Sequence, residues 1–340
     1  MSASDEPRKP TGKNVRVRFV LIVILVLLVL GLSLLLGRYP GPYFTSPAVL
    51  RKDPLARALL LNLRLPRVIM AVLLGMVLSA SGAVFQMVFR NPIVDSGFLG
   101  VTSGASFGAS LAIVMLGGEA WKIQSCAAFF GLLGLAASYY LGQRIRFGDW
   151  AVRLILAGIA VSAIYTSGAG LLKYLADPIK DLPDITFWLL GGIWGATWTD
   201  LLHVMPISVA CLIVLYLLRW RLNLLSMRDE TAFSLGVTAV RERLLLLLAA
   251  VIATTAMVSK TGLVLWVGMI VPHLARRWIG SDAQRSLPAA MIIGGLFVLA
   301  CDNVARTLLP GEIPLGILSS AIGAAIFIII MLKRDWGMRR

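Results

Sequence analysis

Charged residues are scarce in this 340-residue chain, and acidic residues are scarcer than basic ones. Only 14% of the positions hold Asp, Glu, Lys or Arg, whereas 58% are hydrophobic, and the mean hydropathy is +0.85. A soluble domain needs more charge than this to cover its surface. The composition therefore excludes an ordinary soluble protein and indicates a chain that lies in lipid.

Residues that bind metals or act as nucleophiles are also few. The two histidines, His203 and His273, have no Cys, Asp or Glu at ligand spacing, and the three cysteines lie far apart in apolar surroundings. The sequence has neither zinc spacing nor a disulfide pattern, and no nucleophile–base set of an intramembrane enzyme. A phosphate-binding loop of the GxxxxGK[ST] type is missing too. We expect no metal site, no cofactor and no catalytic residue in this chain.

Apolar runs long enough to cross a bilayer are abundant. A hydrocarbon core of about 30 Å needs roughly 20 apolar residues per helix, and short basic or Gly/Pro-containing turns separate such runs here. The sequence predicts an all-α integral membrane protein of about ten transmembrane helices. They are expected at residues 19–36, 66–89, 98–116, 121–141, 153–175, 201–218, 244–258, 263–279, 287–308 and 314–332.

These helices are expected to form one transmembrane domain over residues 19–332. The first run is too long for a signal peptide and lacks a cleavage site, so it is interpreted as an uncleaved helix. Residues 1–18 are polar and basic and are expected to be a disordered cytoplasmic tail. Residues 333–340 would form a second cytoplasmic tail.

The formal net charge of +15 comes from Lys and Arg at the ends of apolar runs. This distribution indicates membrane topology rather than nucleic-acid binding. With the N-terminus in the cytoplasm, the basic clusters fall inside, except for one segment between the first two helices. A basic outer surface there would suit an acidic partner. Its cations are Arg51, Lys52, Arg57, Arg64 and Arg67.

Small residues recur at four-residue spacing in several predicted helices. Such faces let helices approach closely, because association in lipid depends on packing. We interpret them as contacts within the bundle. Examples are Ala71, Gly75 and Ser79, and then Gly100, Gly104 and Gly108.

A series of motifs runs through nearly the whole chain. They are RLPR at 64–67, SGAVFQ at 81–86, RNP at 90–92, FLGV at 98–101, FWLLGG at 187–192, SLGV at 234–237, VGMIVPHLAR at 267–276 and EIPLG at 312–316. In this order they resemble the FecCD, or BtuC-like, family of permeases that import ferric siderophores, haem and cobalamin. Two stretches differ from the usual family pattern, IVDSG at 93–97 and GLVLW at 262–266.

The resemblance implies the fold of a type II ABC importer permease in the bacterial inner membrane, with both termini in the cytoplasm. It also implies a homodimer with a pathway along its axis, an extracytoplasmic substrate-binding protein, and two cytoplasmic ATPase subunits that bind ATP and Mg. The cargo would be an iron–siderophore, haem or cobalamin-type chelate.

A mixed polar and apolar segment near residues 224–240 resembles the family's ATPase-coupling segment, two short helices broken at a glycine. Apolar side chains would enter a groove of the ATPase, and charged ones would form the rim. An ordinary amphipathic loop is the alternative. The coupling candidates are Arg228, Asp229, Glu230, Ala232, Phe233, Leu235 and Gly236.

Arg64, Arg67 and Arg306 match family positions that pair with glutamates of the binding protein, so the resemblance implies a docking surface. Guanidinium groups suit this role because they stay charged and bind carboxylates through two hydrogen bonds. The alternative is that these arginines reach toward lipid headgroups.

Tyr165, Thr166 and Lys173 lie on the fifth predicted helix, which lines the pathway in the family. They are therefore the pathway candidates. Asp302 lies within an apolar helix and must face protein or water, either for structure or for transport.

An ion-coupled secondary transporter is the alternative function. Such proteins usually carry midplane carboxylates or broken helices. Most acidic residues here lie near predicted helix ends, with Asp302 as the main exception.

Overall fold

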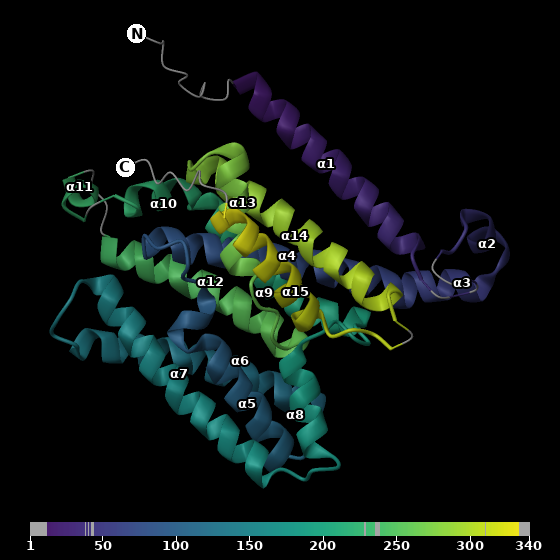
Figure 1. The fold of residues 1–340 in the computed structure, drawn as a ribbon, viewed down its shortest axis with the longest axis horizontal. Helices are drawn as coiled ribbons and strands as arrows, with labels where there is room; N and C mark the ends of the chain where they lie inside the picture. The colour runs from purple at the N-terminus through teal and green to yellow at the C-terminus, as the bar shows by residue number, and fades with distance from the viewer. Residues whose placement is uncertain are drawn as a thin grey trace.

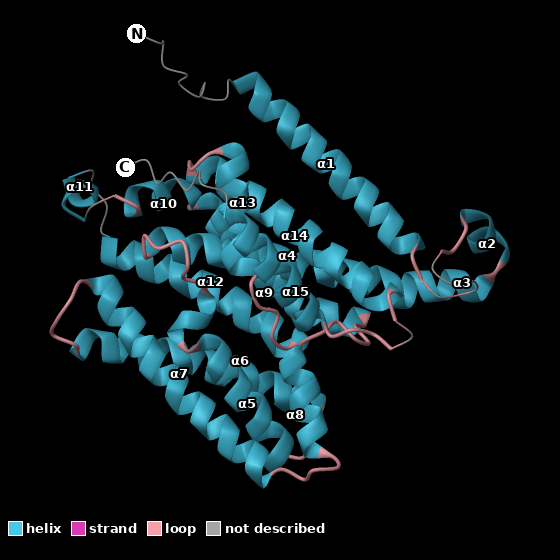
Figure 2. Cartoon of the chain, viewed as in Figure 1, coloured by secondary structure: helices cyan, strands magenta, loops and turns pink. Residues whose placement is uncertain are grey.

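The structure is a computed structural model that describes residues 12–37, 39, 41, 44–227, 229–234, 239–309 and 311–332. These residues form a bundle that is almost entirely helical (Figures 1 and 2). The one β-type pairing among them is an isolated bridge between Leu36 and Phe44. The predicted all-α fold class is thus confirmed.

Ten helices correspond one for one to the predicted spans, and most ends agree within four residues. They are α1 (Gly12–Leu35), α4 (Leu65–Val88), α5 (Val101–Met115), α6 (Ala120–Arg144), α7 (Trp150–Leu175), α9 (Trp198–Leu217), α12 (Ala239–Thr261), α13 (Val267–Ile279), α14 (Ala283–Thr307) and α15 (Leu315–Leu332). Seven described helices are long and apolar enough to cross a membrane, while α1 and α5 carry shorter apolar segments.

One expectation about the N-terminal segment needs correction. Helix α1 begins at Gly12, so residues 12–18 are helical rather than part of a disordered tail. The start of α1 and the end of α15 both lie on the side of α10 and α11, away from α2 and α3 (Figure 1). We use the names "α10–α11 end" and "α2–α3 end" for these two ends of the bundle.

Short helices occupy several stretches that the sequence left as connections. Ser46 and Asp53 cap α2 and α3, and each of these helices has proline in its first turn, which suits a helix start. Helix α3 continues through a π-helical turn into α4, so residues 54–88 form one helical run. The short elements are α2 (Pro47–Lys52), α3 (Pro54–Leu59), η1 (Leu60–Arg64), η2 (Ser96–Leu99), α8 (Asp181–Leu190), α10 (Arg219–Leu225) and α11 (Asp229–Ser234).

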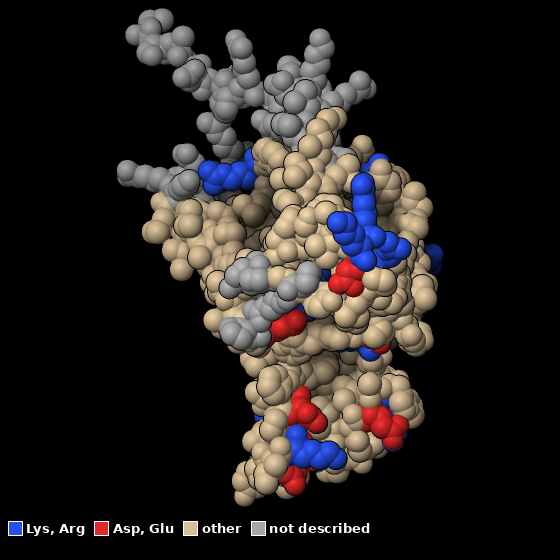
Figure 3. Space-filling view, turned by 90° about the vertical axis from the view of Figure 1, so that its right-hand side faces the viewer, with Lys and Arg blue, Asp and Glu red and all other residues tan. Residues whose placement is uncertain are grey.

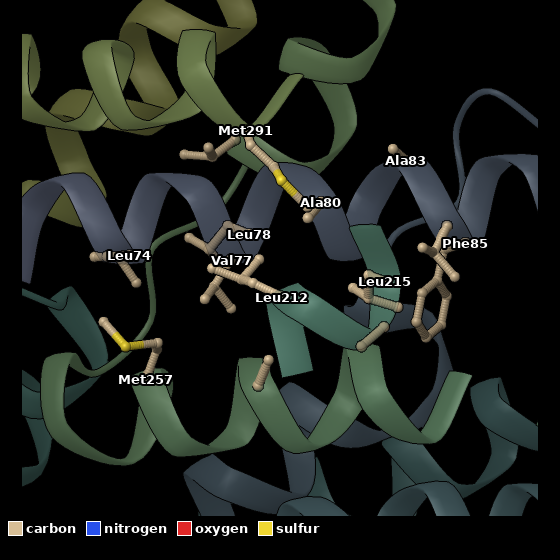
Figure 4. Packing of buried hydrophobic residues seen from close by; sticks show 14 of the residues in the cluster. Leu74, Val77, Leu78, Ala80, Ala83, Phe85, Leu212, Leu215, Met257 and Met291 are labelled. Atoms are coloured by element: carbon tan, nitrogen blue, oxygen red, sulfur yellow. The ribbon is translucent and has the colours of Figure 1, made fainter. Parts of the chain in front are cut away.

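Helix α4 is the centre of the bundle. In its most apolar window 83% of the residues are buried, against 28% in α7 and 22% in α15. Figure 4 shows side chains of α4 packed against Leu212 and Leu215 of α9, Met257 of α12 and Met291 of α14. Helices α5, α6 and α7 form a second group beside α8 (Figure 1). Most of the apolar surface of α7 and α15 is therefore left for lipid or a partner.

Glycines bring helix backbones into direct contact, as the four-residue spacing predicts. A Cβ on Gly75 would overlap the carbonyl of Gly294 in α14, and one on Gly82 would overlap the carbonyl of Gly268 in α13. Gly104 and Gly108 of α5 meet the α6 backbone in the same way. At these positions the backbones of neighbouring helices pack directly against each other, with no side chains between them.

Two breaks interrupt the helices within the bundle. Residues 89–100 return from the end of α4 to the start of α5, and residues 262–266 separate α12 from α13. Gly262 has φ of 63°, and a Cβ there would overlap the carbonyl of Trp188, so both conformation and space favour glycine. Helices α5 and α13 span only about 20 Å at 1.5 Å per residue, less than the hydrocarbon core of about 30 Å.

Candidate functional site

The α2–α3 end holds an ion-pair cluster centred on Arg67. Its guanidinium donates to Asp302 at 2.8 Å and to Glu312 at 2.8 Å. The Asp302 side chain is 1% exposed, whereas that of Glu312 is 37% exposed. The intramembrane carboxylate singled out in the sequence is therefore neutralised by an arginine of a neighbouring helix.

Arg306 and Arg64 anchor the end of α1. Arg306 donates to the hydroxyl of Ser33 at 2.9 Å and to Asn303, and its Nε lies 3.8 Å from Asp302. Arg64 donates to the carbonyl of Leu34 at 3.2 Å and to the Thr45 hydroxyl at 2.9 Å. The structure therefore brings the three docking candidates to one end of the bundle, and each also binds partners within the chain.

Other cations at this end are more exposed. Arg51, Lys52 and Arg57 lie on α2 and α3 with exposed side chains. Figure 3 looks at this end and shows a group of basic atoms above a separate group of mixed charge. Asp53 lies among these cations, and the hydrogen bond from the Tyr39 hydroxyl, 2.9 Å long, lowers the pKa of its carboxyl. The exposed surface of α2 and α3 is thus predominantly basic.

The pathway candidates occupy different surroundings on α7. Tyr165 packs with Phe107 and Phe130 of the adjacent helices, with ring centroids 5.5 Å and 6.2 Å away. Thr166 is exposed, and Lys173 is half-buried. Only Thr166 of the three therefore lies fully on the uncovered face of α7.

A cavity of about 350 Å³ opens beside α8 and was not foreseen from the sequence. Its wall combines the aromatic rings of Phe187, Trp188 and Trp194 with the charged groups of Asp184 and Lys260. Lys260 also forms an ion pair with Asp200 of α9. The Trp- and Gly-rich stretch 188–198 is the signal that could have drawn attention to this region.

Three of the coupling candidates, Arg228, Leu235 and Gly236, lie outside the described residues. The structure gives the backbone of α11 for Asp229, Glu230, Ala232 and Phe233, with Glu230 exposed, and it describes no side-chain surroundings for the other three.

Helix α10, which precedes these residues, is firmly attached to the bundle. Leu222 and Leu225 are fully buried, and Asn223 accepts from the backbone N–H of Ala283 at 2.8 Å. Arg221 pairs with Glu242 at the start of α12. Trp220, by contrast, is 45% exposed. An apolar ring is thus presented on a fixed helix at the α10–α11 end.

Side chains that commonly bind metals are not clustered in the described ranges. No group of three or more His, Cys, Asp or Glu side chains there is arranged to hold a metal ion. Cys126, Cys211 and Cys301 are free thiols.

The described part of the bundle contains seven helices of membrane length, and several of them have apolar faces that the rest of it does not cover. These features are those of a multi-span membrane permease. The chain belongs to the FecCD transport family, which matches residues 19–333. The resemblance found in the motifs is therefore confirmed, and the chain is a permease subunit rather than a catalytic one.

Relatives and solved structures agree with this family. The molybdate import system permease protein MolB of Haemophilus influenzae is 35% identical, over 94% of this chain and 95% of MolB. The hemin transport system permease protein HmuU of Yersinia pestis is 37% identical, over 81% of this chain and 83% of HmuU. A solved inward-facing structure of a metal-chelate type ABC transporter is 34% identical, with a TM-score of 0.86, and covers 93% of this chain and 98% of that one.

Proposed function

We propose that this chain is the membrane subunit of an ABC importer for a metal chelate of the ferric-siderophore, haem or cobalamin kind. The observation that carries the proposal is the likeness, over nearly the full length of both chains, to a metal-chelate type ABC transporter at a TM-score of 0.86. HmuU, which is named for hemin, supports a chelate as cargo. MolB is named for molybdate, so this oxyanion belongs among the cargoes to be tested.

We propose a homodimer in the inner membrane, with α7 and α15 covered by the second copy or by lipid. Support comes from the low burial of both helices and from exposed apolar residues such as Ile164 and Leu171. Exposed apolar area of this extent marks a membrane or protein contact. Thr166, Lys173 and the Tyr165 cluster would then lie beside the pathway.

We propose that the α2–α3 end faces outward and docks an acidic binding protein. The exposed cations of α2 and α3 support this. Arg64 is half-buried, and Arg67 and Arg306 are 12% and 8% exposed, so these three would contribute mainly by supporting the exposed cations. Impermeant thiol labelling of intact cells tests the orientation, after the native cysteines are replaced. A cysteine at Arg51 should react and one at Arg339 should not, and the reverse pattern contradicts the orientation.

The α10–α11 end would then face the cytoplasm and bind two ATPase subunits, which hold ATP and Mg. Support comes from exposed apolar side chains on attached elements, including Trp220, Met227 and Val240. Surfaces that combine aromatic and aliphatic groups with a charged rim suit a protein partner.

Uptake by proteoliposomes tests the function. The chain is reconstituted with its ATPase and binding protein, and ferric siderophores, haem, cobalamin and molybdate are compared with ATP supplied at the ATPase side. We expect ATP-dependent uptake of one chelate that persists when ionophores collapse the ion gradients. Uptake that needs a gradient but no ATP would establish an ion-coupled secondary transporter instead.

A further inference from the structure

The two breaks in the helices meet beside α4 and α12. Residues 95–97 of the first break and 263–265 of the second line one small cavity. The two breaks are in contact at Gly268, because a Cβ on this residue would lie 3.7 Å from the Cβ of Asp95. These are also the two stretches that differ from the usual family pattern. Non-helical backbone at membrane depth needs protein, water or an ion to satisfy its polar groups.

The cavity has a volume of about 20 Å³. This volume suits one guest the size of a water molecule. Its walls come from α4, the start of α5, α12 and the stretch before α13. The lining residues used below are Asp95, Thr102, Thr254, Val264 and Leu265.

Oxygen atoms supply the polar groups of the wall. A Cβ on Gly97 would lie 3.0 Å from Oδ1 of Asp95 and 3.2 Å from Oγ1 of Thr102, so these two oxygens flank one point. Thr254 donates its proton to the carbonyl of Ala250 at 2.8 Å, and its oxygen also lies 3.0 Å from the Ser81 hydroxyl, which leaves one lone pair for a further contact. Within the described chain, the carbonyl oxygens of Val264 and Leu265 accept no hydrogen bond. Oxygen atoms are the ligands that a hard cation prefers.

Asp95 supplies a negative charge without a countercharge. Its Oδ1 accepts from the backbone N–H of Gly97 at 2.8 Å, and among the described residues it has no ion pair. Two other acidic residues of the helical bundle are paired: Asp302 with Arg67, and Asp200 with Lys260. Asp95 is half-buried, and a carboxylate partly removed from water without a partner is costly unless a cation or a proton neutralises it.

We propose that this cavity binds one sodium ion, held by the Asp95 carboxylate, the Thr102 and Thr254 hydroxyls and carbonyl groups of residues 264–265. One carboxylate balances one positive charge, whereas a divalent ion would leave a net charge in the interior. Unwound backbone between half-helices at membrane depth is the arrangement that binds coupling ions in other membrane proteins. The ion would join the α4–α5 break to the α12–α13 break. The site needs no cargo, binding protein or ATPase, so it stands or fails independently of the proposed function.

Thermal unfolding of the purified chain in detergent tests the site, with NaCl replacing choline chloride at constant ionic strength. We expect sodium to raise the wild-type Tm saturably by about 2–5 °C, because a ligand that binds only the folded state stabilises it. Asp95→Asn keeps the shape and the acceptor for Gly97, and it should abolish the response.

Asp177→Asn is the matched control, because Asp177 also caps a turn, through Ile179 and Lys180, but is exposed. This variant should respond to sodium like the wild type. Thr102→Val removes one neutral ligand and should raise the half-saturating sodium concentration about tenfold, as expected for a loss of about 1.4 kcal/mol.

Three results would overturn the proposal. They are equal effects of sodium and choline on the wild type, a full sodium response in Asp95→Asn, and a Tm that rises at lower pH but ignores sodium. The last result would place a proton on Asp95. If Asp95→Asn does not fold, Thr102→Val decides, and an unchanged half-saturating concentration refutes the site.

Discussion

The guanidinium of Arg67 in α4 donates to both carboxylate oxygens of Asp302 in α14, at 2.8–3.1 Å, although 235 positions separate the two residues. Arg67 therefore stabilises the packing of α4 against α14, whether or not it also binds a partner protein. Glu312 binds the outer side of the same guanidinium and is far more exposed. The cluster thus consists of a buried ion pair, Arg67 with Asp302, and a more exposed carboxylate at its rim, that of Glu312.

Removing Arg67 should destabilise the chain much more than removing the charge of Glu312. Arg67→Ala leaves the buried Asp302 carboxylate with only the 3.8 Å contact to Arg306, and breaking a buried pair typically costs about 3–5 kcal/mol. Glu312→Gln breaks a partly exposed pair and should cost at most about 1 kcal/mol. Thermal unfolding in detergent measures both, and equal losses would contradict the distinction between pair and rim.

Reversing the exposed charges of α2 and α3 should weaken docking of an acidic binding protein. Each exposed pair contributes little, about 0–1 kcal/mol, but the triple variant Arg51→Glu/Lys52→Glu/Arg57→Glu replaces attraction with repulsion and slows encounter. We expect about a tenfold or greater loss of affinity at low salt, shrinking as salt screens the charges.

A matched variant at the opposite end controls for net charge in this docking experiment. Arg146→Glu/Arg277→Glu/Arg285→Glu reverses three exposed charges near the α10–α11 end and should bind the partner like the wild type. If both variants lose affinity equally, the effect comes from overall charge rather than from a surface on α2 and α3.

Adding a methyl group at Gly75 should separate α4 from α14. The new Cβ of Gly75→Ala would overlap the carbonyl of Gly294, and a backbone carbonyl cannot rotate away as a side chain can. Overpacking of this kind costs about 1–3 kcal/mol or more. Gly170→Ala is the control, since a Cβ there meets nothing within 4 Å, and its Tm should stay the same or rise. A Gly75→Ala variant as stable as the control would refute the contact.

Protonation of Glu119 should be visible in the fluorescence of Trp121. The Lys122 ammonium donates to this carboxylate at 2.9 Å and the Trp121 indole at 2.6 Å, and together they lower the pKa of Glu119. A lowered pKa contributes stability above the unfolded value and loses it as pH falls through the folded value. The difference spectrum between wild type and Glu119→Gln should therefore titrate below the ordinary glutamate range. Lys122→Met should move the midpoint upward, and no movement would exclude the ammonium as the main cause.

Trp220 should contribute to coupling with the ATPase. Its ring is 45% exposed on an attached helix, so Trp220→Ala should lower ATPase binding about tenfold or more while leaving the Tm nearly unchanged. Phe147→Ala removes an exposed aromatic side chain from the α6–α7 turn and serves as the control.

Deletion of residues 228–234 should uncouple ATP hydrolysis from transport. Normal substrate-stimulated hydrolysis in the deletion variant would reject the coupling role.

Much of the fold could be predicted because lipid imposes a length and a polarity on each span. All ten predicted helices have counterparts, and the spacing of Gly75 correctly indicated a close contact. Helix α8 was missed, since Asp181, Pro183 and Asp184 interrupt its apolar pattern. Nothing in the local sequence distinguishes it from a loop.

The partners of charged residues could not be predicted, because they depend on how distant helices pack. The sequence marked Asp302 as costly and Arg67 as unusual, yet it did not pair them. Asp95 was noted only as part of the stretch 93–97 that differs from the family pattern, since it follows the end of a predicted helix and resembles a loop acid. Only the return of residues 89–100 into the bundle places it beside the α12–α13 break.

The backbone contacts of Gly75 with Gly294 and of Gly82 with Gly268 leave no deformable layer between α4, α14 and α13. These three helices are therefore expected to move as one rigid body that extends from one end of the bundle to the other. Arg276 donates to Gln86 at one end of this rigid body, and Arg67 lies at the other end. A displacement near Arg276 would therefore move Arg67 as well, because no layer of side chains between the helices can deform. Any relative movement of the helices must be taken up elsewhere, where side chains still separate them.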